Sequence, residues 1–258
     1  MFHILFALVI FSSLCFLLFI GVLLGRLLGR WKMEHHPLKK VEVITVVEGA
    51  VFTLLGLLVA FTFTGAYDRF EKRKIHIIEE ANAVETAYMR IGLLSPKTQT
   101  PIKQSMKEYL DMRITAYKLI PHLDAAFALV NQSNLLKEKI WEEALQACKI
   151  TNDSSATQLL IPALNAMFDA ENTGFALTGV HPPVIIFLLL IGLSVLSAFL
   201  AGFTSVEGKT NHFLYMQIYI IIMAFVIYLI IDLELPRVGL VRVTSFDQYL
   251  VDVRNRMN

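Results

Sequence analysis

Four long runs of apolar residues divide the chain, and a polar stretch separates the second run from the third. The runs cover residues 4–24, 43–67, 182–206 and 213–231, and Glu48 is the one charged residue within them. A helix needs about 20 residues to cross the hydrocarbon core of a bilayer, so each run is long enough. The first run has no preceding basic segment or small-residue cleavage site, which favours a span over a cleaved signal. The pattern predicts four transmembrane helices.

The polar stretch between the second and third runs predicts a helical domain outside the membrane. It contains 13 basic and 14 acidic residues, and its apolar residues recur at spacings of three and four. We expect the second span to continue unbroken to about residue 91, and further helices to follow; no strand pattern persists. The chain is therefore predicted to be an all-α membrane protein. The expected divisions are a first hairpin (1–67), an extramembrane helical domain (68–181), a second hairpin (182–235) and a tail (236–258), with domain helices over about 101–120, 124–149 and 155–177.

The side of the membrane is less clearly marked. Four spans place both termini and the large domain on one side, and we expect that side to be the cytoplasm and the membrane to be the cell inner (plasma) membrane. Basic residues near the span ends number six on one side and eight on the other, so charge does not decide the orientation. The basic loop expected over residues 29–41 runs against this choice.

Composition and charge narrow the class of protein further. Hydrophobic residues make up 55% of the chain and charged residues 17%, with a net charge of +1, so no basic field is available to bind nucleic acid. Cys15 and Cys148 cannot form a metal knuckle, and the adjacent His35 and His36 point apart on a helix or strand. Phosphate-loop, dinucleotide, zinc-hydrolase and serine-hydrolase motifs are missing. We therefore expect no catalysis, no cofactor and no bound metal.

Ionisable residues close to the spans are candidate functional groups. Glu48 either lies within the membrane, where it faces protein or water, or lies at the headgroup level, and the sequence favours neither. Asp232 and Glu234 follow the fourth span. They form either an acidic ring at a pore mouth or a polar helix end, and the second is the more economical interpretation.

One face of the second span carries threonines together with large apolar side chains. Thr53, Leu57, Phe61 and Thr64 follow one another at spacings of four, four and three, which places them in a single stripe. Such a stripe can line a pore whose narrowest part is an apolar ring. It can also pack against other helices of a four-span bundle, and small residues nearby would permit close approach.

The stretch LLGLLVAFTFTGAYDRFEKR, from Leu54 to Arg73, resembles the end of the second transmembrane helix of bacterial bestrophins. The order of two spans, a helical domain and two spans also agrees. Bestrophins are pentameric ion channels with a neck of three side chains on this helix. The resemblance, carried through Tyr67-Asp68-Arg69-Phe70, implies a neck at Thr53, Leu57 and Phe61, with Asp68 and Arg69 near the pore mouth.

A wider similarity covers almost the whole chain, which is identified as a member of the bacterial bestrophin-like integral membrane family of unknown function. Bestrophins differ in having Arg-Asn where this chain has Thr62-Phe63, and a second aromatic residue in place of Glu71. The separated Asp247 and Asp252 do not match the calcium clasp of the animal channels. The matching motifs are EEANAVETAYMRI from Glu79, the segment Tyr109 to Arg113, IPALNAMFDA from Ile161, His181-Pro182-Pro183, and DLELPRVGLVRV from Asp232.

Oligomers need an interface, and the helix that continues the second span offers a stripe for one. We expect it to pack and pair with a neighbouring subunit. The expected interface residues are Phe70, Arg73, Ile77, Glu80 and Val84.

Three functions remain open at this point. The leading hypothesis is an oligomeric, pentameric ion channel with a central pore lined by the second span, conducting anions in preference to cations. Its partners would be permeating ions, membrane lipids and copies of itself, not nucleic acid. The first alternative is a non-conducting scaffold or sensor whose helical domain binds a partner. The second is an ion-coupled transporter that uses Glu48.

Overall fold

A computed structural model describes residues 2–35, 41–119, 123–207 and 212–257. Within these ranges the chain is helical, with short connections and no strand, as the sequence predicts. The chain forms two compact units, and α2 contributes to both. We call them the membrane unit (Met1–Arg69 and His181–Val241) and the helical unit (Phe70–Val180 and Arg242–Asn258).

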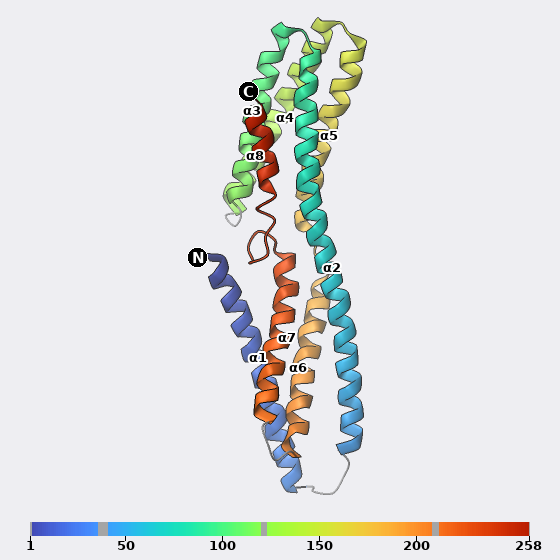
Figure 1. Ribbon diagram of the computed structural model, residues 1–258, viewed down its shortest axis with the longest axis vertical. Coiled ribbons are helices and arrows are strands. Elements are labelled where there is room, and N and C mark those ends of the chain that lie inside the picture. The colour runs from blue at the N-terminus through green and yellow to red at the C-terminus, as the bar shows by residue number, and fades with distance from the viewer. Residues whose placement is uncertain (1, 36–40, 120–122, 208–211, 258) are drawn as a thin grey trace. The chain divides into compact units, whose positions relative to one another are not determined.

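The membrane unit consists of α1 (Phe2–His35), the first half of α2 (Val41–Arg90), α6 (Val184–Thr204) and α7 (His212–Glu234). In length and apolar composition the structure contains four helices that can cross a membrane, so the four predicted spans are confirmed. Figure 1 shows α1, α6 and α7 as a group, with the lower half of α2 along its edge.

The contact between α1 and α6 depends on glycine. A methyl group added at Gly25 would lie 2.0 Å from the carbonyl oxygen of Phe199, and one at Gly202 would lie 2.3 Å from that of Val22. Apolar side chains gain little from leaving lipid, so spans associate through close packing, and small residues let two backbones approach. Gly21, Gly25 and Gly29 share one face of α1, so α1 approaches α6 closely over more than two helical turns.

Two expected boundaries are wrong. The basic segment over residues 29–41 was expected to be a loop, but α1 continues to His35, because Gly29 still packs on Phe203 of α6. The remaining residues 36–40 lie outside the described part. The helix expected from Pro101 begins five residues earlier, at Pro96. Proline suits the first position of a helix, and Thr98 closes that turn by donating its N–H to the carbonyl of Ser95 at 2.9 Å.

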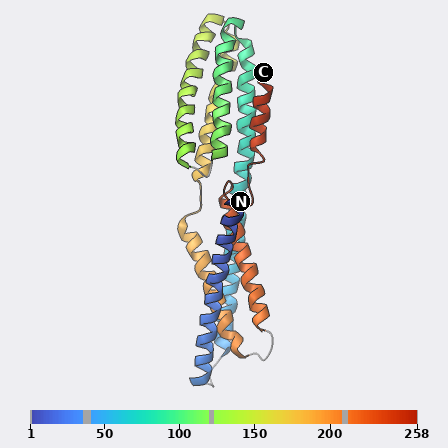
Figure 2. The same ribbon diagram turned by 90° about the vertical axis from the view of Figure 1, so that its left-hand side faces the viewer.

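The helical unit contains the second half of α2 together with α3 (Pro96–Leu119), α4 (Leu123–Thr151) and α5 (Ser154–Gly179). Figures 1 and 2 show these long helices side by side, with α8 against them. Asp153 begins α5 as its N-cap, because its carboxylate accepts the N–H of Ser155 at 2.8 Å. The interior is apolar except for a group of buried charged residues, and its most enclosed apolar side chains include Ile91, Met106, Leu110, Ile140, Leu160, Leu164 and Met167.

The C-terminal helix α8 (Asp247–Arg256) has no counterpart in the expected elements. Its apolar Leu250 and Val253 are buried in the helical unit. Arg254 donates to both carboxylate oxygens of Asp111 at 2.8 Å, and Arg256 donates to Glu85 at 2.8 Å. Two buried side chains and two ion pairs therefore hold this short polar helix in place.

Candidate functional site

The membrane half of α2 leaves most of its surface uncovered by its own chain. Only 6% of the residues in its most apolar 18-residue window are buried, against 28% for α1 and 33% for α7. The covered face carries Leu55 and Ala66, which are 1% and 0% exposed, and Phe52, whose ring centroid lies 5.7 Å from that of Tyr219. This span therefore has a narrow face toward the chain and a wide face toward its surroundings.

The four residues of the expected pore stripe all lie on the wide face. Thr53, Leu57, Phe61 and Thr64 are exposed, with Leu57 at 53% and Phe61 at 69%. At about 100° per residue, the centre of this stripe lies on the side of the helix opposite Leu55. The stripe is thus the part of α2 farthest from the rest of its own membrane unit.

The two threonine hydroxyls of the stripe bind their own helix. The Thr53 hydroxyl donates to the carbonyl of Gly49 at 2.8 Å, and the Thr64 hydroxyl donates to that of Ala60 at 2.9 Å. A hydroxyl has one hydrogen and two acceptor lone pairs, so each presents only acceptor capacity outward in this geometry. The stripe therefore has two acceptor positions with Leu57 and Phe61 between them.

Glu48 lies at the end of a span. Its carboxylate is half-buried and accepts a hydrogen bond of 3.3 Å from the hydroxyl of Thr204, the last residue of α6. Because an apolar helix ends at that level, this position matches the headgroup interpretation of Glu48.

Asp232 and Glu234 both lie inside the membrane unit. Asp232 is fully buried and accepts the N–H groups of Leu240 at 2.9 Å and Val241 at 2.7 Å, together with the hydroxyl of Tyr228 at 2.7 Å. A methyl group at Gly239 would lie 2.0 Å from the Asp232 carboxylate, so the loop after α7 fits closely around it. Asp232 therefore organises a helix end.

Glu234 joins three segments of the membrane unit. Its carboxylate is 3% exposed and accepts the Nε–H of Arg69 at 2.7 Å. The Nδ1 of His181, just before α6, lies 3.3 Å from its other oxygen. The neighbouring Asp68 is exposed. Of the charged residues expected at the pore mouth, the structure brings Arg69 and Glu234 together and encloses both acidic residues in the last turn of α7.

The residues expected at a subunit interface are instead buried in their own helical unit. Phe70, Arg73, Ile77, Glu80 and Val84 are at most 7% exposed. Arg73 donates to the carbonyls of Leu177 at 3.1 Å and Val180 at 2.8 Å, close to the C-terminal end of α5. An apolar stripe in water needs other helices to cover it, and contacts with α3 and α5 bury these side chains within their own chain.

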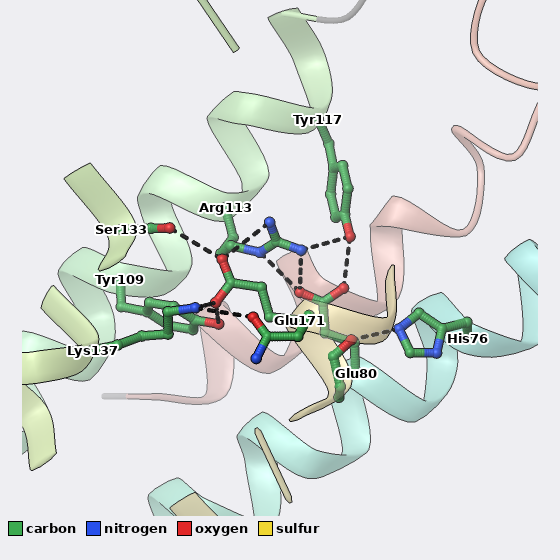
Figure 3. Close-up of polar contacts among 10 residues, drawn as sticks. His76, Glu80, Tyr109, Arg113, Tyr117, Ser133, Lys137 and Glu171 are labelled. Atoms are coloured by element: carbon green, nitrogen blue, oxygen red, sulfur yellow. Dashed lines mark hydrogen bonds and ion pairs between the residues drawn. The ribbon is translucent and has the colours of Figure 1, made fainter. Parts of the chain in front are cut away.

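A network of buried charges lies at the centre of the helical unit (Figure 3). Arg113 of α3 donates through Nε and Nη2 to Glu80 of α2 at 2.9 and 2.8 Å. Tyr117 also donates to Glu80, at 2.6 Å. On the other side of Arg113, Glu171 of α5 forms an ion pair with Lys137 of α4 at 2.8 Å. Two carboxylates and two cations therefore balance one another, and the hydroxyls of Tyr109 and Ser133 also donate to Glu171.

This environment sets the protonation of Glu171 and Tyr109. Burial acts to raise the pKa of Glu171, but Arg113 and Lys137 outweigh it and the pKa is lowered. Burial raises the pKa of Tyr109 well above its ordinary value, and the charge of Glu171 adds to that effect. Glu171 is thus ionised and Tyr109 neutral near pH 7, which suits a structural network. Across the described residues, no three His, Cys, Asp or Glu side chains are grouped as metal ligands.

The fold defines an all-helical, multi-pass membrane protein whose helical unit is built mainly from the part of the sequence between the second and third spans. Solved structures share this fold. Two substituted forms of a bacterial bestrophin homologue from Klebsiella pneumoniae match with TM-scores of 0.69 and 0.68, at 14% and 13% identity. The matches cover 95% and 94% of this chain and 97% and 99% of those chains. A further crystal structure, described as a membrane protein, matches with a TM-score of 0.65 at 16% identity, covering 95% and 99% of the two chains.

The Bestrophin-like domain family model matches residues 10–246, and the chain belongs to this family. The expected family is therefore confirmed. No protein of curated function matches the sequence.

Proposed function

We propose that the chain is a subunit of a ring-shaped ion channel, a pentamer, whose central pore is lined by α2. The supporting observation is the stripe on α2 that faces away from the rest of its membrane unit. In this proposal α1, α6 and α7 face lipid or neighbouring subunits. The helical unit and both termini lie in the cytoplasm, and the spans lie in a bacterial inner membrane.

The constriction in this proposal is made by Leu57 and Phe61. Repeated around an axis, these two exposed side chains form stacked apolar rings one helical turn apart. A narrow apolar ring stops conduction by losing its water. Thr53 and Thr64 lie on either side of these rings, where their hydroxyl oxygens can replace water around a partly dehydrated ion.

A path through one chain has less support. The backbones of α1 and α6 are close enough that a methyl group at Gly25 would collide, which leaves no room for water between them. Arg69 and Glu234 neutralise one another at one end of the unit. An ion therefore needs an axis built from several copies, and the threonines of the α2 stripe would give that axis polar groups.

The family resemblance and the hydroxyls of the stripe favour opposite signs of the permeant ion. The family resemblance favours anions. The hydroxyls of Thr53 and Thr64, however, donate to their own helix and present acceptors, which solvate cations. Anion conduction would require these hydroxyls to turn away from the carbonyls. The reversal potential under opposed chloride and potassium gradients decides between the two signs.

The experiment is ion flux from the purified oligomer in liposomes, with Phe61→Ala beside the wild type. Phe16→Ala is the matched control, because Phe16 is 66% exposed on α1 and Phe61 is 69% exposed on α2. The proposal expects conductance to rise in Phe61→Ala alone, because its neck is wider. Equal currents from all three assembled proteins would overturn the neck. Absence of flux from every intact oligomer would overturn conduction and favour the scaffold.

A further inference from the structure

The last turns of α1 carry a cluster of basic side chains that the channel proposal does not use. Arg26, Arg30 and Lys32 are separated by few residues, and Trp31 lies among them. We propose that this end of the membrane unit, the α1 basic end, binds the phosphate headgroup of an acidic phospholipid. The site does not depend on whether the protein conducts ions.

Contacts with α6 place the α1 basic end at the membrane surface. Gly25 packs on Phe199 and Gly29 on Phe203, and α6 ends at Thr204. The cluster therefore begins about one helical turn before the end of an apolar span. Side chains at that depth meet the phosphates of the bilayer, and tryptophan is typical of this level.

Within the part of the chain that the structure describes, these cationic groups lack a protein counter-charge. Arg26 and Arg30 are four residues apart and share one face of α1, where like charges repel. Neither forms an ion pair within the described residues, and the Nε of Arg26 is buried there with no hydrogen-bond partner. The Lys32 ammonium lies over the Phe203 ring, 5.4 Å from its centroid. Glu34, the one acidic residue in these turns, is exposed. An anion from outside the chain would offset the charge of these side chains.

The surrounding surface is apolar, which favours a lipid over a free anion. Leu27 is 66% exposed and Trp31 55% exposed, beside the two arginines. A bound lipid could place its acyl chains along Leu27 and its phosphate at the guanidinium groups, which bind phosphate through two parallel donors. A zwitterionic lipid offsets its phosphate with its own ammonium group, whereas an acidic lipid keeps a net negative charge.

The fluorescence of Trp31 can measure lipid binding at this site. The full chain with Trp141→Phe would be reconstituted in phosphatidylcholine vesicles that contain brominated phosphatidylglycerol or, separately, brominated phosphatidylcholine. Bromine quenches the emission of a nearby tryptophan. We expect the phosphatidylglycerol to quench Trp31 at a lower mole fraction than the phosphatidylcholine. Arg26→Gln/Arg30→Gln should reduce this preference by about fivefold for each cation removed, whereas Lys97→Gln/Lys149→Gln, at exposed lysines of the helical unit, should leave it unchanged.

Three results would overturn the proposal. The first is equal quenching of Trp31 by the two lipids in the Trp141→Phe protein. This result does not depend on whether the arginine variant folds. The second is an unchanged preference in a folded Arg26→Gln/Arg30→Gln protein. The third is an equal loss of the preference in Lys97→Gln/Lys149→Gln, because the effect would then follow net charge and not this site.

Discussion

The two halves of α2 differ in how much their apolar side chains are exposed. In the helical unit, Ile77, Val84 and Ala87 are at most 4% exposed, because water drives apolar groups under the cover of other helices. In the membrane half, Leu57 and Phe61 remain more than half exposed. Either lipid or neighbouring subunits can cover apolar side chains of a span, so exposure alone does not mark a functional face. The threonines that accompany these residues on the α2 stripe are the polar groups on which the pore proposal rests.

The two units also differ in where their charged side chains lie. The helical unit encloses Glu80, Arg113 and Glu171 at its centre, where several helices supply partners. In the membrane unit, Arg69 pairs with Glu234 at the ends of spans. A charge far from water in lipid is costly, so the membrane unit relies on close glycine contacts for its interior.

The largest effect is expected from breaking the central charge network. Arg113→Met leaves Glu80 and Glu171 buried without their shared cation, which should cost about 3–5 kcal/mol of unfolding free energy. Thermal unfolding of the full chain in detergent, followed by circular dichroism, measures the loss. Lys149→Met, which removes an exposed cation from α4, is the control. Equal midpoints for the two variants would show that the network adds no stability.

A side chain at the α1–α6 contact tests the membrane unit in the same way. Gly25→Leu must separate two backbones that a single methyl would already bring into collision, at a cost of about 1–3 kcal/mol. Gly192→Leu is the matched control, because a side chain there meets open space. The unfolding midpoint in detergent should fall for Gly25→Leu only. A matching fall in the control would assign the effect to leucine itself.

Acid should weaken the helical unit through Glu171. Its folded pKa is lowered from the ordinary 4.5, so the stabilisation by its ionised form is present above pH 4.5 and is lost as the pH falls through the lower folded pKa. The difference in unfolding midpoint between wild type and Glu171→Gln should therefore shrink as the pH is lowered from 7 to 3. Glu138→Gln, at an exposed position of α4, should follow the wild type throughout. A constant difference for Glu171→Gln would contradict the lowered pKa.

The smallest effect is expected from the two threonines of the stripe. Thr53→Val/Thr64→Val keeps the shape of both side chains but removes their acceptor oxygens. The relative permeability of potassium and chloride should change, by less than conductance changes in Phe61→Ala. Thr62→Val is the control, because the half-buried Thr62 donates its hydroxyl to Leu58 at 2.8 Å on a different face of α2. Identical reversal potentials in all three proteins would exclude the hydroxyls from the ion path.

Local patterns predicted the helices well because their causes are local. Length and hydropathy alone define the spans, and Asp153 marks the start of α5 through a cap within its own sequence. The helix α8 could not be predicted in this way. It is mostly polar, and it is held by Arg254 and Arg256 pairing with residues of distant helices.

The partners of the site residues depend on tertiary structure. Glu80 and Arg113 are 33 positions apart, so their pairing, and the burial that removes Glu80 from any interface, follow only from how α2 meets α3. The spacing of Gly21, Gly25 and Gly29 is visible in the sequence, and small residues at every fourth position could have indicated a close helix contact. The sequence alone could not indicate the level of Glu48 in the membrane, because that inference rests on its hydrogen bond with Thr204 at the end of α6.

The central claim is that the uncovered stripe of α2 faces water inside an assembled ring. Its most direct test is reaction of single cysteines with a charged, water-soluble methanethiosulfonate in liposomes, in a background with Cys15→Ala and Cys148→Ala. The account expects Thr53→Cys to react and ion flux to change with it. Leu188→Cys, 61% exposed on α6, should stay unmodified in lipid. Protection of Thr53→Cys to the same degree as Leu188→Cys in an intact oligomer would contradict a pore lined by α2.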